Sequence, residues 1–495
     1  MVTVLSQHRR FFVAAALAGL VLRLAFLVYF PTVTDDSHVY LNLATNWMQH
    51  GIYGQMQGTE IVPTSARLPG YPSFLAVIFS IFGVGNIRAV LLAQIVIDMA
   101  TCLLIADLAR RTIRTSMATR AAFALAATCP FLANYAAAAL TETLEIFFTV
   151  VALDCAAAGL ERLDGTNGTT GRGVISWPLW IATGAAIGAS ILVRPDGGLL
   201  IPAVIAYLVV MWARRLSPTA RRAMPSARLD STAARLETPA TSQASSSVPS
   251  ISFFAVAAIS AVLAVTALSP LVPWTLRNLH TLHRFQPLAP RYANESDELA
   301  PRGFNRWVKT WMAEYASVEE IYWNVPGDKI DVDKLPARAL DEPGRAETLA
   351  TIAQYNQSQD LTPALDARFG ELATERVKKH PFRSYLWLPA LRVADMWLRP
   401  RTEILPPDPR WWEFNDDRRE SALAVGFGVL NLAYVAAAML ALTRNRTWFC
   451  YLGLLASFVL LRTLFLGTVE NPEPRYTLEC YPVILVWASA LFARL

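Results

Sequence analysis

The chain has 495 residues, of which 54% are hydrophobic and only 17% are charged. Soluble domains carry about 25% charged residues, so this composition excludes an ordinary soluble fold. The net charge of +5 comes without a long run of Lys or Arg, which argues against a nucleic-acid partner. The five cysteines show no CxxC spacing, which argues against a zinc site or a disulfide framework.

Ten stretches are apolar and close to the length of a membrane-spanning helix, about 20 residues. In chain order they are 11–31, 88–108, 118–139, 142–159, 175–193, 197–213, 251–273, 421–442, 447–466 and 479–494. The first lies where a signal peptide would, but it lacks a small-x-small cleavage site and is predicted to be an uncleaved helix. The sequence therefore predicts an all-α polytopic membrane protein.

Arginines gather in the loops on one side of these predicted spans. The arginine-rich segments are 9–10, 110–120, 214–235 and 444–446. The positive-inside rule makes this side cytoplasmic, so both termini are predicted to be cytoplasmic. The Arg- and Ala-rich composition suggests a bacterial inner membrane, with loops 32–87, 274–420 and 467–478 facing the periplasm.

Two connecting segments differ in kind. Residues 214–250 are rich in Ser, Thr, Ala, Pro and Arg without an apolar period, which predicts a disordered cytoplasmic linker. Residues 281–420 are polar but hold half of the tryptophans, which predicts a small folded external domain in the periplasm. An N-terminal membrane module at 1–280 and C-terminal membrane helices at 421–495 make up the rest.

The end of the external segment, residues 381–400, has an amphipathic pattern. Its apolar residues fall largely on one helical face: Phe382, Tyr385, Leu388, Leu391 and Trp397. That pattern is typical of a helix lying in the membrane interface, which Pro389 would kink. An ordinary amphipathic helix of the external domain explains it equally well.

The first outer loop, 32–87, begins with two adjacent acids, Asp35 and Asp36, at the start of a short helical pattern. A carboxylate at the mouth of a membrane cavity can take a proton from a hydroxyl nucleophile. It can also have a purely structural role, because Asp36 or Ser37 is a good helix N-cap. The residues alone favour capping slightly.

The same loop holds Arg67, just before an apolar run from 73 to 83 that is too short to cross a bilayer and is predicted to be re-entrant or interfacial. A guanidinium beside a helix N-terminus makes an anion site. A headgroup-facing arginine is the alternative interpretation.

Other charges are predicted on the outer side or in the outer half of the membrane. They are Glu142, Arg194, Asp196, Arg277, Arg462, Glu470, Glu473 and Arg475. Ionisable groups at membrane depth are costly and usually functional, so their shared position indicates a site. Arg23 and Asp98 lie deeper and are predicted to pair for structural reasons.

These motifs together resemble the GT-C superfamily of membrane glycosyltransferases, in particular the protein O-mannosyltransferases and the aminoarabinose transferases of lipid A. The matching stretches are Asp36-Ser37-His38-Val39-Tyr40 with Leu43-Ala44, Arg67-Leu68-Pro69-Gly70-Tyr71-Pro72, Thr141-Glu142, Arg194-Pro195-Asp196, Pro273-Trp274-Thr275-Leu276-Arg277-Asn278, and Arg475-Tyr476 with Pro482. The resemblance covers residues 10–280 and, more loosely, 420–495. Each motif is weak alone, but their order and their fit to the topology are specific.

The resemblance implies a GT-C-like helix bundle with short juxtamembrane helices in the first outer loop. It also implies inverting transfer of a sugar from a polyprenyl-phosphate donor to a hydroxyl of a lipid, glycan or protein acceptor. The catalytic acid of the first loop falls on Asp36, with Asp35 as a possible second acid because the O-mannosyltransferases have Asp-Glu where this chain has Asp-Ser. Arg67, Arg475 and Arg277 are expected to bind the donor phosphate. Glu142, Tyr476 and Tyr40 are expected to orient the sugar or the acceptor.

No cofactor is predicted, because the loop lacks an Asp-x-Asp motif, although the departure from the family pattern leaves metal use open. Membrane lipids are the other expected partner. A transporter or flippase is one alternative function, and a polymerase or ligase of lipid-linked glycans is another. The chain shows no convincing internal repeat, and its charges lie toward the outer face, which favours the transferase over a transporter.

Overall fold

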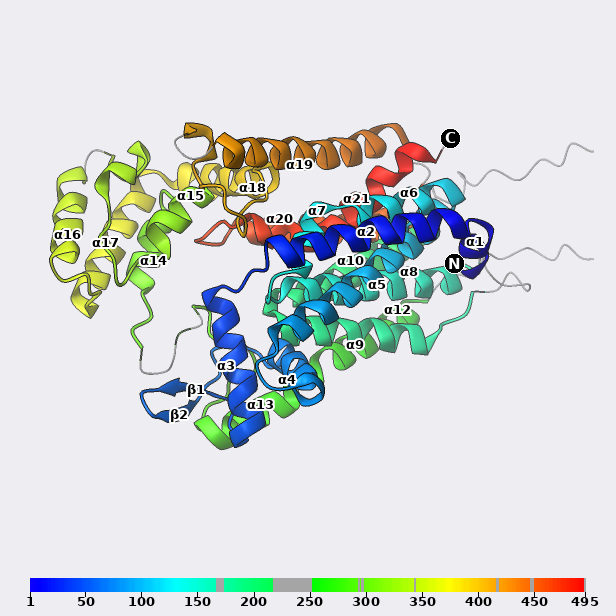
Figure 1. The fold of residues 1–495 in the computed structure, drawn as a ribbon, viewed down its shortest axis with the longest axis horizontal. Helices are drawn as coiled ribbons and strands as arrows, with labels where there is room; N and C mark the ends of the chain where they lie inside the picture. Colours follow the sequence, from blue (N-terminus) through cyan, green and yellow to red (C-terminus); the bar gives the residue numbers. More distant parts are fainter. Residues whose placement is uncertain are drawn as a thin grey trace, which may run out of the picture.

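The computed structural model describes residues 1–165, 173–216, 252–292, 294, 298–341, 344–414, 418–445 and 449–493. Nearly all regular structure in these residues is helical, as the sequence predicted (Figure 1). Their only sheet is the hairpin of β1 (Gly54–Gln57) and β2 (Glu60–Pro63). The predicted linker lies outside the described residues from 217 onward.

The helices of the N-terminal part are α1 Val2–Gln7, α2 Arg9–Tyr29, α3 Asp35–His50, α4 Gly70–Phe82, α5 Ile87–Ile113, α6 Ser116–Ala127, α7 Pro130–Ala136, α8 Glu142–Leu163, α9 Trp177–Val193, η1 Pro195–Leu199, α10 Leu200–Leu216, α12 Phe253–Leu268 and α13 Leu271–Leu282. The helices that follow are α14 Arg302–Lys309, α15 Tyr315–Ser317, η2 Val318–Tyr322, η3 Val332–Lys334, η4 Ala337–Ala339, α16 Arg345–Ser358, α17 Pro363–Lys379, η5 Arg383–Trp387, α18 Leu388–Leu398, η6 Trp411–Glu413, α19 Arg418–Asn445, α20 Leu452–Leu466, η8 Pro474–Cys480, α21 Tyr481–Ser489 and η9 Ala490–Phe492.

By length and composition, five helical stretches of the described residues could cross a membrane, and two bent helix pairs raise the number to seven. The five are α2, α5, α8, η1 with α10, and α19; the bent pairs are α6–α7 and α12–α13. These seven match seven of the ten predicted spans. The other three match α9, α20 and α21, which have only 17, 15 and 9 residues. The last is short because η8 takes up the residues before Tyr481.

Helix α8 lies at the centre of the bundle, packed against α5 and α9. Small residues such as Ala156 and Gly159 allow this close approach. A Cβ at Gly159 would come within 2.9 Å of the Trp180 ring of α9. This packing fixes the position of Glu142, the first residue of α8, beside η8.

The deep pair predicted between Arg23 and Asp98 is present. Arg23 Nε donates to Asp98 Oδ2 at 2.5 Å, and both side chains are buried. The guanidinium also donates to the carbonyl oxygens of Gly19 and Ala127. The N–H groups of the guanidinium are thus bound by Asp98 and by these carbonyl oxygens. The pair joins α2 to α5 and to the end of α6, which is a structural role.

The external segment has a hydrophobic core of its own, which includes Trp307, Trp311 and Phe369 from α14, its C-terminal turn and α17. Figure 1 shows α14, α16 and α17 at one end of the helix bundle, and the N- and C-termini at the other end. The placement of both termini on the cytoplasmic side of a membrane stays a prediction. The buried guanidinium of Arg392 in α18 donates to the carbonyl oxygen of Met312 at 2.9 Å and to that of Gly467, after α20, at 3.5 Å, and so ties this segment to the bundle.

The predicted amphipathic helix at 381–400 is divided into η5, a π-helical turn, and α18. Phe382, Tyr385 and Trp387 are 68%, 74% and 55% exposed, whereas Leu388 is fully buried. Leu388 therefore does not lie on the exposed aromatic face, where the pattern predicted it. The π turn inserts an extra residue and so shifts the helical register of the residues that follow. Whether this face lies in the membrane interface stays a prediction.

Candidate functional site

The site begins at the N-terminus of α3, where Thr34 is the N-cap. The Thr34 hydroxyl accepts the Ser37 backbone N–H, and the Ser37 hydroxyl accepts that of Thr34, forming a capping box. The prediction that Asp36 or Ser37 is the N-cap is therefore wrong by two or three residues, because the side chain of Thr34 reaches the N3 position first. Asp36 does not cap the helix and is directed elsewhere.

The Asp36 carboxylate lies between two guanidiniums that come from distant parts of the chain. Arg67 Nη2 donates to Asp36 Oδ1 at 3.0 Å, and Arg475 Nη2 donates to Asp36 Oδ2 at 3.4 Å. Asp36 remains 34% exposed at its side chain, against 22% for Arg67 and 16% for Arg475. Burial raises the pKa of Asp36, but Arg475 and Arg67 outweigh it, so the pKa lies below its usual range. The result is an accessible, ionised carboxylate held by two cations.

Arg67 is positioned by the β1–β2 hairpin and by α3. The Tyr53 hydroxyl, at the start of the hairpin, donates to the backbone carbonyl oxygens of Arg67 and Leu68. The Arg67 guanidinium lies 6.0 Å from the ring centroid of Tyr40 in α3. Asp35, the other acid of this helix turn, is exposed. The structure thus brings together Asp36, Arg67 and Tyr40, three of the predicted site residues.

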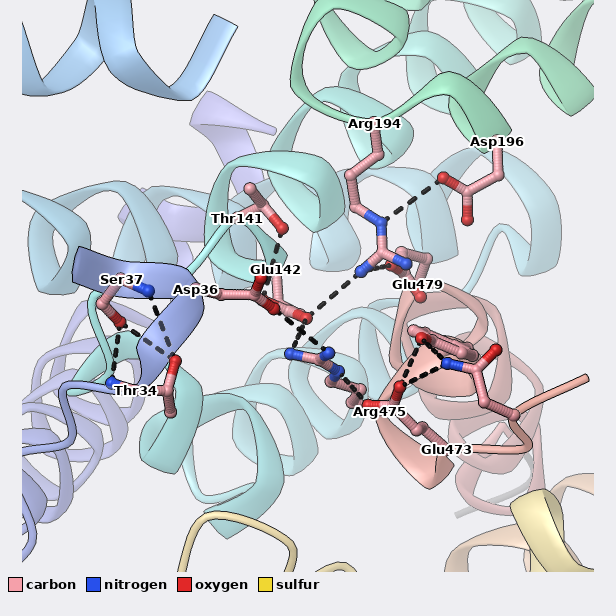
Figure 2. Close-up of polar contacts among 12 residues, drawn as sticks. Thr34, Asp36, Ser37, Thr141, Glu142, Arg194, Asp196, Glu473, Arg475 and Glu479 are labelled. Carbon is pink, nitrogen blue, oxygen red and sulfur yellow. Dashed lines mark hydrogen bonds and ion pairs between the residues drawn. The ribbon is translucent and has the colours of Figure 1, made fainter. Parts of the chain in front are cut away.

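Arg475 joins Asp36 to a second carboxylate, Glu142. Arg475 Nη1 lies 3.8 Å from Glu142 Oε1, and Arg475 Nε lies 2.5 Å from Glu473 Oε2 (Figure 2). Burial lowers the pKa of the Arg475 guanidinium, but the surrounding anionic groups, Glu473 first, raise it well above its ordinary value. Arg475 is therefore a fixed cation between Asp36, Glu142 and Glu473.

Behind Glu142 the ion-pair network continues into the bundle. Arg194 Nη1 lies 3.2 Å from Glu142 Oε1 and 3.8 Å from Glu479 Oε1 (Figure 2). Arg462 Nη2 then pairs with Glu479 and with Asp196, at 2.9 Å each. Glu142, Glu479 and Arg462 are at most 1% exposed at their side chains.

The last outer loop adds a small hydrogen-bonded group. The Tyr476 hydroxyl donates to Glu473 Oε1 at 2.5 Å, and Asn471 Nδ2 donates to the same oxygen at 2.9 Å. The guanidiniums of Arg194 and Arg475 lie 5.1 and 5.6 Å from the Tyr476 ring centroid. Tyr476 therefore lies within the charged network.

Three network residues were missed or undervalued by reasoning from sequence. Glu479 was assigned to an apolar span, and Asn471 carried no signal that set it apart. Glu473 was recognised as an outer charge but given no role. The available signal was the position of Glu473, which comes two residues before Arg475 and three before Tyr476, at the start of a 3-10 turn.

Arg277, the third arginine predicted to hold phosphate, has other partners. Its guanidinium donates to the carbonyl oxygens of Tyr53 at 2.6 Å and Thr64 at 2.7 Å. It also lies over the rings of Tyr53 and Trp274. In this arrangement Arg277 supports the hairpin that positions Arg67 and does not contact the Asp36 carboxylate.

Among the described residues, no group of three His, Cys, Asp or Glu side chains has a geometry that could hold a metal ion. The carboxylates of the site instead face guanidiniums, which satisfy their charge directly.

Residues 66–222 match a family model described as dolichyl-phosphate-mannose-protein mannosyltransferase. This match agrees with the resemblance to the protein O-mannosyltransferases over this part of the chain and covers Arg67, Glu142 and Arg194. No curated protein sequence matches the chain.

Two solved structures are similar over nearly the whole chain. One is the archaeal oligosaccharyltransferase AglB from Archaeoglobus fulgidus in complex with an inhibitory peptide and a dolichol-phosphate, with 12% identity, a TM-score of 0.48, and coverage of 98% of this chain and 50% of that one. The other is ArnT from Cupriavidus metallidurans bound to undecaprenyl phosphate, with 15% identity, a TM-score of 0.39, and coverage of 97% and 77%. The chain thus spans half the length of the archaeal structure. Both similarities are remote, and the roles assigned below come from the geometry of this chain.

Proposed function

We propose that this protein is an inverting glycosyltransferase that moves a sugar from a polyprenyl-phosphate donor to a hydroxyl of a lipid, glycan or protein acceptor. The reaction takes place at the outer face of the bacterial inner membrane. The single observation that carries the proposal is the Asp36 carboxylate, which is accessible and ionised and lies between two guanidiniums at the end of a membrane helix bundle. The family match of residues 66–222 supports the reaction class.

Asp36 acts as the general base. Its carboxylate takes the proton from the acceptor hydroxyl while the acceptor oxygen forms a bond to the anomeric carbon of the sugar. The bond between that carbon and the phosphate oxygen breaks, and polyprenyl phosphate leaves with the electron pair. Attack from the face opposite the phosphate inverts the anomeric carbon.

Arg67 and Arg475 stabilise the leaving phosphate. Both guanidiniums already lie within 3.4 Å of Asp36, so a phosphate that binds them is held next to the base. Fixed charges aimed at the place where charge develops usually make the largest contribution to catalysis. Guanidiniums also suit phosphate oxygens because they donate in pairs.

Glu142, Arg194 and Glu473 keep Arg475 in place. They hold its guanidinium directly or through one further ion pair, and Glu142 and Glu473 are buried. A cation that is already oriented needs little reorganisation when the donor binds. Tyr476 and Tyr40, which lie over or beside these guanidiniums, orient the sugar or the acceptor.

The test is sugar transfer from a panel of labelled polyprenyl-phosphate sugars in membranes that contain the native chain or the Asp36→Asn variant. Loss of the base is expected to lower the rate by about 10²- to 10⁴-fold. Asp35→Asn is the matched control, because it removes the neighbouring, exposed carboxylate of the same helix turn. Native-level transfer by Asp36→Asn would contradict the role of Asp36, and failure of the native chain with every donor and membrane acceptor would contradict the function.

A further inference from the structure

A hollow is lined in part by the two outer loops that carry the arginines of the Asp36 site. It has a volume of about 1570 Å³ and lies between α14, α17 and the loops that join the external segment to the membrane helices. Its wall includes Thr64 and Ser65 from the first outer loop and Glu470 from the last one. These two loops also supply Arg67 and Arg475. Ordinary small-molecule pockets measure about 300–1,000 Å³, so this one suits a larger ligand.

The described side chains around this hollow, here called the outer cavity, are mainly cationic. Three acids line it, Glu298, Asp366 and Glu470, against six cations: Arg284, Arg291, Arg302, Arg306, Lys309 and Lys378. Two of the acids are already occupied by the protein itself. Asp366 accepts the backbone N–H groups of Gly303 and Phe304 at 2.9 Å each, at the start of α14. Glu470 pairs with Arg291 and Lys309.

Four cations are left over. Among the described residues, no carboxylate forms an ion pair with Arg284, Arg302, Arg306 or Lys378, and all four side chains are exposed. Arg306 donates to the Thr374 hydroxyl at 3.0 Å. Arg302 and Lys378 lie on α14 and α17, which pack against each other and present their charges from two neighbouring helices. Anionic oxygens that enter the outer cavity meet an excess of positive charge from several directions.

We infer that the outer cavity binds the acceptor through phosphate groups, so that the acceptor of the transfer is a phosphorylated molecule. The inference rests on the proposed function and specifies its acceptor class. The phosphates bind Arg302, Lys378 and Arg284, and an acceptor hydroxyl reaches from the cavity toward Asp36. Guanidinium and ammonium groups recognise phosphate by charge-assisted hydrogen bonds. The cavity therefore recognises the acceptor by its phosphate charge, whatever sugar or lipid the acceptor contains.

The first test measures binding without transfer. The full chain in nanodiscs of phosphatidylcholine is titrated with short-chain phosphatidic acid and, separately, with glycerol 3-phosphate. Arg302→Ala/Lys378→Ala is expected to weaken binding about tenfold or more, since two charge-assisted contacts are lost. The control Lys329→Ala/Arg345→Ala removes two exposed cations of the same segment outside the cavity and leaves binding unchanged. Binding of the lipid alone indicates a phospholipid-like acceptor, and binding of both indicates a soluble phosphorylated one. Failure of both probes overturns the inference.

The second test separates this inference from the proposed function. Labelled sugar is transferred from the donor to acceptors extracted from membranes, and the products are sorted on an anion exchanger with and without phosphatase. The expected product is anionic until phosphatase treatment, and the double cavity variant raises the KM for the acceptor about tenfold while leaving the KM for the donor unchanged. A neutral product, or an unchanged acceptor KM in the variant, overturns the inference while the transferase stands. Absence of any transfer by the native chain contradicts the proposed function, whereas the binding test still decides the cavity.

Discussion

Two arginine–aspartate pairs in this protein have similar chemistry but different surroundings. Arg23 and Asp98 are at most 3% exposed at their side chains, and Arg23 is further bound by backbone carbonyl oxygens. Asp36 is 34% exposed and shares its two oxygens between Arg67 and Arg475. The first pair is closed to any ligand, whereas the second is open to one. Accessibility therefore separates a pair that is closed inside the bundle from one that a ligand can reach.

The largest expected effect in this comparison is on stability, at the closed pair. Arg23→Ala leaves Asp98 buried without its cation, and removal of one partner of a buried pair costs about 3–5 kcal/mol. Thermal unfolding of the purified protein in detergent measures the loss. The control is the double variant Arg23→Leu/Asp98→Leu, which leaves no buried charge and is expected to be closer to the native stability. An unchanged unfolding temperature for Arg23→Ala would show that the pair is not structural.

The next effect is on catalysis, at the open pair. Arg475→Gln and Arg67→Gln each remove one cation from the expected phosphate position, at a cost of about 10²- to 10³-fold in kcat, by analogy with the loss of one donor to a developing anion. Steady-state transfer kinetics with the donor varied measure this. Arg277→Gln is the matched comparison, because its guanidinium binds backbone carbonyl oxygens of the hairpin. An effect of Arg277→Gln as large as that of Arg475→Gln would place Arg277 in the phosphate site.

The smallest effect is a shift in pH dependence. Arg475 and Arg67 hold the pKa of Asp36 below its ordinary value of 3.8, so the base stays ionised above about pH 5, and its acid limb in kcat/KM lies below about pH 4. Removal of Arg67 raises the pKa of Asp36 and moves this limb to higher pH. The profile of kcat/KM from pH 3 to 8 for the native chain and Arg67→Gln tests this. A native limb near pH 6 that Arg67→Gln does not move would assign the base to another group.

The apolar pattern predicted most of the membrane helices, because a helix in lipid satisfies its own backbone and its length is set by the bilayer. The sequence also placed Asp36 and Glu142 at the starts of helices and Arg67 just before α4. The sequence was misleading at the N-terminus of α3, where several neighbouring side chains could be the N-cap. Thr34 takes the position expected for Asp36 or Ser37. It also overestimated the lengths of α9, α20 and α21 as spans.

Composition and the order of the motifs by themselves indicated a helical membrane protein whose charges gather at one end, with an acid at the start of α3. Only the tertiary structure decided which charges meet. Arg475 reaches Asp36 across a separation of 439 residues, whereas Arg277, the next candidate by sequence, binds the hairpin. Glu479 was hidden in an apolar stretch, yet it pairs with Arg194 and Arg462. The physical reason is that an ion pair depends on distance and solvent access, and the packing of helices sets both.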